Sequence, residues 1–223
     1  GMEALIRWNH PEKGLITPEK FIPIAEEIGL INEIGLYMLD TGCKQLRDWI
    51  DQGFEPQKLS INVSTYQLTE CDFDITVCNL VRKYKLPQNM LMLEITETSL
   101  MQDMETVLPR LKNLSKCGIG ISIDDFGVGY SSLSYLQTLP IDLLKIDRSF
   151  LNCNDENPDA ICIIKAIVAM ARELKLEVIV EGVETNRQLE YIKNIGCYLV
   201  QGFLLGRPLP EQEIRKLFTI TQS

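Results

Sequence analysis

The regular alternation of short apolar segments with longer amphipathic segments is the feature that most constrains how this chain can fold. Seven short segments have the two-residue periodicity of β-strands, and we expect strands at about 2–8, 59–64, 91–98, 119–126, 143–147, 177–183 and 198–204. Between them lie segments with helical periodicity or helix-start signals, and we expect helices at about 18–28, 31–51, 73–84, 104–116, 131–139, 159–174, 186–195 and 211–218. This order is typical of parallel strands whose connecting helices cover the outside of the sheet.

In each expected strand the polar residues fall at alternate positions, that is on one parity, and so face one side of the sheet. This pattern favours a closed barrel over an open doubly wound sheet. Ile61 and Val63, for example, face one side of their strand while Asn62 faces the other. The central strands of open doubly wound sheets are apolar on both faces. A closed parallel barrel has eight strands, and the alternation leaves room for the missing one only before Gly1. We therefore expect a TIM-type (β/α)8 barrel that lacks its first N-terminal helix and strand.

The composition fits one globular domain over residues 1–223. The chain is 45% hydrophobic and 24% charged, and no linker or low-complexity run divides it. Its formal net charge of −9 argues against binding of long nucleic acid, which needs Lys and Arg to neutralise phosphates. No apolar run reaches the roughly 18 residues of a membrane span, so we expect no membrane contact by this domain.

The cysteine and histidine content excludes several kinds of site. The seven cysteines are odd in number, scattered and without a CxxC pair, which indicates reduced thiols in a cytosolic protein rather than a disulfide framework or a zinc site. They are Cys43, Cys71, Cys78, Cys117, Cys153, Cys162 and Cys197. The single histidine, His10, precedes Pro11 in an expected turn, which argues against a His-based catalytic triad or a His-rich metal site.

The most unusual strand end is Ser122-Ile-Asp-Asp-Phe-Gly127, where two adjacent carboxylates follow an apolar strand. Two unit charges about 5 Å apart repel by roughly 3 kcal/mol at an effective dielectric of about 20. The pair must therefore be solvated, protonated or bound to a cation. Strand alternation sends Asp124 and Asp125 to opposite faces, so Asp125 can join a common site only if the chain turns directly after Asp124, as Gly127 and Gly129 permit.

The other strands also end in polar residues, and the C-terminal ends of the strands build the active site in barrels of this kind. Near these ends, one polar residue from each strand faces the same side of the sheet; these residues are Glu3, Asn62, Glu94, Asp124, Lys145, Glu181 and Gln201. Asp125 lies just beyond its strand. For any one of them a structural role is the simpler interpretation, for example a salt bridge at Glu94. The whole set, at one depth, favours a functional site.

The charges of this set predict the cofactor. Five carboxylates and one lysine sum to −4, which two divalent cations would neutralise. All-oxygen ligation with one amide suits Mg²⁺ or Mn²⁺ and not zinc. Two such ions can share a carboxylate, activate water and neutralise a phosphoryl transition state. We therefore expect hydrolysis of a phosphodiester without a covalent intermediate.

An ordered series of motifs carries a family resemblance over essentially the whole chain. The segments MEALIRW, SINVS, EITE, DDFG, KID, EGVE and QGF resemble the signature series of the EAL domain, the bacterial cyclic di-GMP phosphodiesterase. A lone EAL tripeptide would carry no weight, whereas the ordered set with these spacings is highly specific. The resemblance implies hydrolysis of cyclic di-GMP to linear pGpG.

The resemblance also implies a role for each residue. Glu3, Asn62, Glu94 and Asp124 would hold one metal, and Asp124 would bridge to a second that Asp125 and Glu181 also serve. Lys145 would orient or help to deprotonate the attacking water, with Gln201 near it. Arg7 would meet a substrate phosphate, which suits a guanidinium fork. Glu97 would brace the loop 127–132, and Glu184 would support the ligands from behind.

The resemblance has further implications for assembly. We expect a homodimer through the loop after Asp125 and the following helix, fusion to regulatory domains, and a cytoplasmic location in bacteria, either in a soluble protein or as the cytosolic part of a larger membrane protein. Family members carry a helix and a strand before the EAL motif, including a Gln-Pro segment of the guanine site, which this chain lacks. Val128 stands where the family more often has Thr, so we expect the loop switch to be altered.

Two other functions stay open at the level of the sequence. A cyclic di-GMP receptor that binds without cutting usually lacks a metal ligand or the lysine, and none is missing here. A metal-dependent lyase or isomerase of the enolase type also uses carboxylates, Mg²⁺ and lysine in a barrel. Its ligands cluster on consecutive strands, whereas Glu3 and Glu181 lie far apart around the expected ring.

Overall fold

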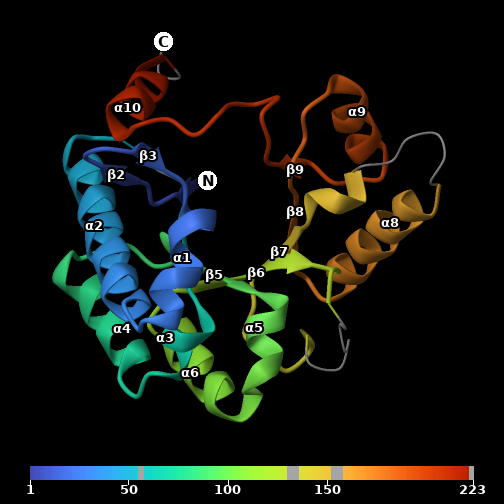
Figure 1. The fold of residues 1–223 in the computed structure, drawn as a ribbon. Coiled ribbons are helices and arrows are strands. Elements are labelled where there is room, and N and C mark those ends of the chain that lie inside the picture. Colours follow the sequence, from blue (N-terminus) through green and yellow to red (C-terminus); the bar gives the residue numbers. More distant parts are fainter. Residues whose placement is uncertain (55–57, 130–135, 152–157, 221–223) are drawn as a thin grey trace.

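Seven parallel strands form one curled sheet at the centre of the molecule (Figure 1). The computed structural model describes residues 1–54, 58–129, 136–151 and 158–220, with the backbone alone for 102, 158–161 and 217–220. The sheet order is β1 (Met2–Ala4), β4 (Leu59–Asn62), β5 (Leu91–Thr96), β6 (Gly120–Phe126), β7 (Leu143–Ile146), β8 (Glu177–Val180) and β9 (Leu199–Val200). The expected number of strands and their parallel direction are confirmed.

The register of the strands brings their C-terminal ends to one edge of the sheet. Asn62 of β4 is paired with Glu94 of β5, and Thr96 at the end of β5 is paired with Asp124 of β6. Between β6 and β7 the register shifts between Ile123 and Phe126. This irregularity includes both adjacent aspartates, so the ladder is interrupted where the two carboxylates leave the strand.

The described sheet is a half-barrel with two free edges. β1 and β9 are the terminal strands, and the described residues contain no backbone pairing between them. The chain that leaves β9 instead runs to α10 (Glu211–Ile220), which lies beside α2 (Ile31–Asp51) in Figure 1. Trp49 Nε1 on α2 donates a hydrogen bond to Glu211 Oε1 on α10 at 3.2 Å, so this contact ties the C-terminal helix to the N-terminal half of the molecule.

Helices cover the outer face of the curled sheet. α2, α4 (Phe73–Lys83) and α6 (Met104–Lys116) lie along β4 to β6, while α8 (Pro158–Glu173) and α9 (Asn186–Asn194) lie along β7 to β9 (Figure 1). Leu46 of α2, Leu93 of β5 and Leu111 of α6 are fully buried between the layers. Within the described residues, no helix is both long and apolar enough to cross a membrane.

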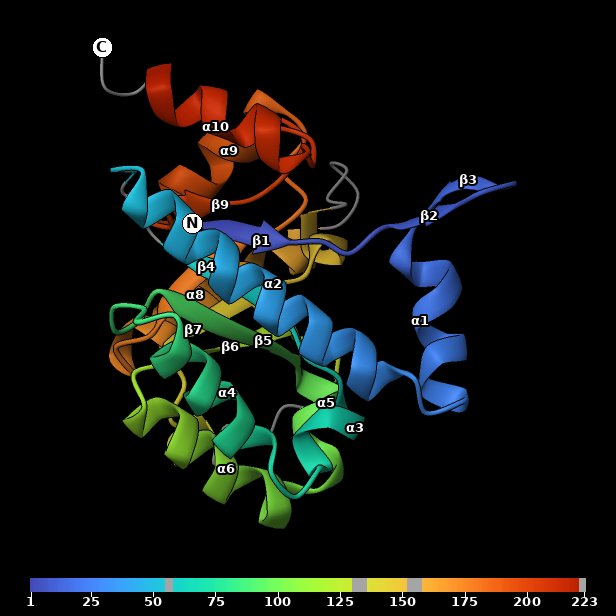
Figure 2. The ribbon, with the colours of Figure 1, turned by 90° about the vertical axis from the view of Figure 1, so that its left-hand side faces the viewer.

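Several short elements were not expected from the sequence. The expected strand over 2–8 was wrong in its extent: β1 ends at Ala4, and β2 (Trp8–His10) pairs with β3 (Gly14–Ile16) in a separate antiparallel hairpin. The hairpin projects to one side together with α1 (Pro18–Glu27), as Figure 2 shows. Three short helices were also missed: α3 (Thr65–Thr69), α5 (Glu97–Gln102) and η1 (Arg148–Leu151). Most of the helix expected over 131–139 lies outside the described residues.

The interpretation of all the cysteines as reduced thiols was wrong for two of them. Cys78 of α4 and Cys117 at the C-terminal end of α6 form a disulfide, with their Cα atoms 5.9 Å apart. The packing of α4 against α6 brings together residues 39 positions apart, which sequence spacing does not reveal. Cys43, Cys71, Cys162 and Cys197 are free thiols, and Cys153 lies outside the described residues.

Candidate active site

The candidate site is built around the ammonium group of Lys145 on β7. Its side chain is 1% exposed, and its Nζ lies 2.7 Å from Glu181 Oε1 and 2.8 Å from Glu94 Oε2. Asp124 Oδ1 and Glu3 Oε2 follow at 3.4 Å and 3.5 Å. Four carboxylates from β1, β5, β6 and the end of β8 therefore meet one buried cation. The convergence that strand parity predicted is confirmed for these five residues.

Glu3 also connects the two free edges of the sheet. Its carboxylate accepts a hydrogen bond from Asn62 Nδ2 at 2.7 Å and another from Gln201 Nε2, also at 2.7 Å. Because Glu3 lies on β1 and Gln201 directly follows β9, the second bond spans the side on which the described strands do not pair. Both amides thus lie at the site, as expected from their strand positions.

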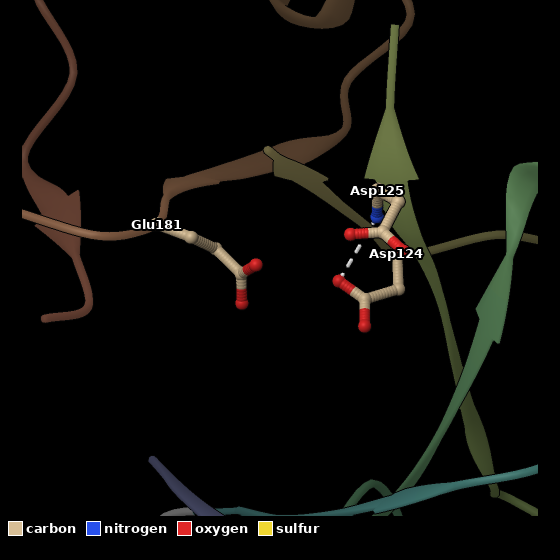
Figure 3. A group of neighbouring side chains, drawn as sticks. All are labelled: Asp124, Asp125 and Glu181. Atoms are coloured by element: carbon tan, nitrogen blue, oxygen red, sulfur yellow. Dashed lines mark hydrogen bonds between the residues drawn. The ribbon is translucent and has the colours of Figure 1, made fainter. Parts of the chain in front are cut away.

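Asp124, Asp125 and Glu181 form a group that could hold a metal ion. One carboxylate oxygen from each lies within 4.8 Å of the others. Figure 3 shows the Glu181 side chain directed toward the aspartate pair, whose members are joined by a hydrogen bond from Asp125 N to Asp124 Oδ1 of 3.0 Å. Asp125 has a left-handed backbone (φ 52°), which turns the chain directly after Asp124. The turn required for Asp125 to join the site is confirmed.

One ammonium group cannot balance all of these carboxylates, and their pKa values differ accordingly. Burial raises the pKa of Glu94 and of Glu181 to about 7, and neighbouring carboxylates add to the rise while Lys145 opposes it. Burial, followed by the charge of Asp124, also raises the pKa of Asp125. Burial acts in the same sense on Glu3, but Lys145 and the hydrogen bonds from Gln201 and Asn62 together hold its pKa below the usual range.

The lysine responds in the opposite direction. Burial alone would lower the pKa of the Lys145 ammonium, but the surrounding carboxylates, Glu94 first, raise it instead. Lys145 is therefore a permanent cation in this site. The metal-free cluster is left with excess negative charge in partly buried surroundings, and its donors are carboxylate and amide oxygens. Hard divalent cations fit this donor set and this charge.

Glu97 supports the turn after the aspartate pair. Its carboxylate is 3% exposed, at the first position of α5, and accepts a hydrogen bond from Gly127 N at 2.9 Å. Gly127 has φ 97°, and a Cβ on Gly129 would lie only 3.1 Å from Glu97 Oε1. Gly127 thus adopts a backbone conformation that favours glycine, and Gly129 leaves room for the Glu97 carboxylate. The contact between Glu97 and the loop that the family resemblance implied is present.

Two residues from the predicted set have no hydrogen bond or ion pair with the cluster in the part of the chain that the structure describes. Arg7 follows β1 and its Nη1 donates to the carbonyl of Ile6 at 2.8 Å. Glu184 is exposed, and its backbone N–H donates to Gln188 Oε1 at 2.9 Å. Val128 is also exposed. The structure therefore leaves the roles of Arg7, Glu184 and Val128 as predictions.

Asp147 is an acidic residue of this edge to which the sequence analysis gave no role. It follows β7 directly, its Oδ1 accepts a hydrogen bond from Ser149 N at 2.9 Å, and its charge contributes to the raised pKa of Asp125. Like the other acids it lies at the end of a strand, and this position was the sequence feature from which its place at the site could have been predicted. Asp147 lies two residues after Lys145 and so has the same parity, but it stands just beyond the end of β7.

Fold and site together define a class of protein. The chain is a parallel α/β half-barrel of the TIM type, whose strand ends carry an acidic site suited to divalent cations. The model of the EAL domain family matches residues 1–208, and this chain belongs to that family.

Relatives and solved structures agree with this assignment. The chain is 46% identical over 214 residues to the bifunctional diguanylate cyclase/cyclic di-GMP phosphodiesterase MucR of Pseudomonas aeruginosa, and 41% identical over 209 residues to the cyclic di-GMP phosphodiesterase NbdA of the same organism. These alignments cover 96% and 94% of this chain but only 31% and 27% of the relatives. A solved structure of the PaMucR phosphodiesterase in complex with c-di-GMP superposes with a TM-score of 0.91 at 46% identity, covering 95% of this chain and 86% of that one.

Proposed function

We propose that this chain is a metal-dependent phosphodiesterase domain that hydrolyses cyclic di-GMP to linear pGpG by attack of water. The observation that carries the proposal is the meeting of four carboxylates from four parts of the sheet at Lys145, in a chain of the EAL family. The names of MucR and NbdA and the c-di-GMP complex of PaMucR support the substrate. The family match gives no support to the enolase-type alternative.

The ligands for two divalent cations, Mg²⁺ or Mn²⁺, would come from residues already gathered at the site. They are Glu3, Asn62, Glu94, Asp124, Asp125 and Glu181. When bound, such ions supply Lewis-acid stabilisation of the phosphoryl group and lower the pKa of a water. These residues fit divalent cations because their summed negative charge exceeds the single positive charge of Lys145.

The remaining residues would act on the substrate and on water. Lys145 stays protonated, so it orients the attacking water and places a positive charge beside the reacting phosphate. Gln201 holds Glu3 through a hydrogen bond of 2.7 Å and thereby fixes the position of a metal-binding carboxylate. Arg7 would bind a substrate phosphate, and Glu184 would support the loop after Glu181.

We further propose that the domain works within a longer protein and in the cytoplasm. The chain spans about a third or less of the relatives it matches, which supports fusion to regulatory domains. A homodimer through the loop after Asp125 and the following helix remains part of the proposal, although much of that segment lies outside the described residues.

Product analysis tests the proposal. The chain is incubated with cyclic di-GMP and Mn²⁺ or Mg²⁺, and the nucleotides are separated by chromatography. We expect linear pGpG from the wild type and none from Lys145→Ala, while Lys165→Ala, which removes an exposed lysine of α8, serves as the matched control. Binding of cyclic di-GMP by the wild type without any product would overturn the enzyme and favour the receptor.

A further inference from the structure

The disulfide between Cys78 and Cys117 lies away from the candidate site and has no part in the proposed reaction. It connects the middle of α4 to the C-terminal end of α6, and β6 begins three residues later at Gly120. β6 carries Asp124 and Asp125 near its other end, about 13–17 Å from Gly120 along the strand. The bond therefore links α4 to the short segment between α6 and the strand that supplies the acidic pair.

The two sulfur atoms have different surroundings. Cys78 is 5% exposed, whereas Cys117 is only partly buried and can be approached from solvent. Arg82 Nη2 lies 3.9 Å from Cys117 Sγ. A guanidinium at this distance stabilises a thiolate, the reactive form of cysteine, so Cys117 has both the access and the electrostatic support of an exchanging thiol.

The buried free thiols of the described chain lack these properties. Burial raises the pKa of Cys43 to about 12 and also raises the pKa of Cys197. Cys71 and Cys162 are exposed, but neither is bonded to a second described cysteine. Within the described residues, a reactive thiol with a partner sulfur in bonding position is therefore found only at Cys117.

We propose that Cys78 and Cys117 form a reversible redox site that exchanges with low-molecular-mass thiols and disulfides. In the oxidising direction, the Cys117 thiolate attacks a small disulfide RSSR, forms a mixed disulfide and releases RS⁻. The Cys78 thiol then loses its proton and attacks the Cys117 sulfur, which forms the protein disulfide and releases the second RS⁻. Two protein thiols are oxidised, one small disulfide is reduced to two thiols, and two electrons are transferred. Reduction follows the same steps in reverse.

The oxidation state is expected to control the stability of the chain more than its basal chemistry. The disulfide closes a loop of 39 residues and restricts the unfolded chain. At the junction that it secures, Asn89 N donates to Gly118 O at 2.7 Å, so the start of β6 also has a backbone anchor that does not depend on the sulfur atoms. Reduction should therefore weaken this region without dismantling the strand.

Thiol mapping in defined redox buffers tests the proposal. The chain is equilibrated with glutathione mixtures, quenched with acid and an alkylating agent, and digested without reduction. We expect the peptide containing Cys78 linked to Cys117 to predominate in excess oxidised glutathione and to disappear in excess reduced glutathione. Thermal unfolding should show a Tm about 5–10 °C lower for the reduced form.

Three variants complete the test. The double variant Cys78→Ser/Cys117→Ser should have one Tm in both buffers, whereas Cys71→Ser/Cys162→Ser should keep the full difference. Arg82→Gln should slow the exchange at least about threefold, as expected when thiolate support is lost. The proposal is overturned if oxidised glutathione gives no linked peptide, if the bond persists in excess reduced glutathione under native conditions, or if the Tm difference survives in the Cys78→Ser/Cys117→Ser variant.

Discussion

At the scale of the residue, the site has one buried cation among several acids that compete for it. Lys145 contacts Glu94 and Glu181 at 2.8 and 2.7 Å, yet burial still raises the pKa of both carboxyl groups to about 7. This combination shows that the ammonium does not fully stabilise the ionised cluster. We therefore expect added positive charge to have the largest effect on the stability and protonation of the carboxylates at the site.

Replacement of Asp124 by Asn tests this charge balance. Asn retains an acceptor for the hydrogen bond from Asp125 N, which measures 3.0 Å, but removes one negative charge. We expect the Tm in EDTA to stay within about 2 °C of the wild type, because relief of repulsion offsets the lost contact with Lys145. Mn²⁺ at about 100 times its Kd should raise the wild-type Tm by about 5–10 °C and the variant hardly at all.

Scanning fluorimetry with and without Mn²⁺ gives both values. Asp51→Asn is the matched control, since it changes an exposed aspartate paired with Arg47 on α2. A metal response in Asp124→Asn equal to that of the wild type would contradict the assignment of Asp124 as a ligand.

The raised pKa values of Glu94 and Glu181 predict how the metal-free chain responds to pH. Because the folded state favours their protonated forms, their contribution to stability is fully present below about pH 4.5 and is lost as the pH rises through about 7. The lowered pKa of Glu3 acts below that window and does not cancel the effect. We therefore expect the Tm in EDTA to fall between pH 5.5 and 8.

Thermal unfolding across this range is compared with Glu94→Gln/Glu181→Gln, in which the fall should be much smaller. If the wild type becomes more stable toward pH 8, or if both proteins follow the same curve, the assigned protonation is wrong.

Strand parity was enough to predict most of the residues in the cluster. A polar residue at the end of a buried strand is unusual, so Glu94, Asp124 and Lys145 could be assigned from the pattern alone. The same pattern also covers Asp147, which has the parity of Lys145 two residues earlier, although it lies just beyond the end of β7. Side-chain partners such as Gln201 for Glu3 depend on the curvature of the sheet, which a linear pattern does not contain.

At the scale of the element, the turn between β6 and the following segment depends on α5. Thr96 begins this helix as its N-cap, with Oγ1 accepting from Ser99 N at 3.3 Å, and the next residue is Glu97. The helix thereby holds the Glu97 carboxylate against Gly127 N. The short α5 was not expected, because a six-residue helix gives too little periodicity to separate it from the end of a strand.

Replacement of Glu97 by Ala should loosen this turn without touching the carboxylate cluster itself. Loss of the hydrogen bond to Gly127 N frees the backbone after Asp125, so we expect the affinity for Mn²⁺ to fall about 10-fold or more while the far-UV circular dichroism is unchanged. Isothermal titration with Mn²⁺ measures the change. Glu105→Ala, which removes an exposed glutamate from the first turn of α6, is the control. Equal affinity in both variants would argue against coupling between this turn and the site.

At the scale of the whole molecule, the alternation of strands and helices predicted the parallel sheet and its seven strands. It did not predict the hairpin of β2 and β3, because that segment interrupts the alternation with strands of only three residues each. The sequence pattern also could not predict the contact of α10 with α2 through Glu211 and Trp49, because these residues are 162 positions apart. Long-range contacts of this kind are set by the completed fold.

The two edges of the half-barrel are connected at the candidate site. Metal binding at this site is therefore expected to affect the whole sheet. Glu3 on β1 and Gln201 after β9 form a hydrogen bond of 2.7 Å between the two edge strands. Metal bound by Glu3 and Glu181 would strengthen this connection, so we expect slower amide hydrogen exchange in β1, β8 and β9 on addition of Mn²⁺. The separate β2–β3 hairpin should not change and serves as the internal control. Slowing confined to β6 would show that the edges are not coupled.

The dependence of cyclic di-GMP turnover on a divalent cation decides whether the acidic cluster is a catalytic metal site. The initial rate of substrate loss is measured for the wild type in Mg²⁺ or Mn²⁺, in EDTA, and beside Asp124→Asn. We predict turnover only with the metal, and a rate at least about 100-fold lower in the variant. Equal rates in EDTA and in metal, or an unimpaired variant, would contradict the proposed function.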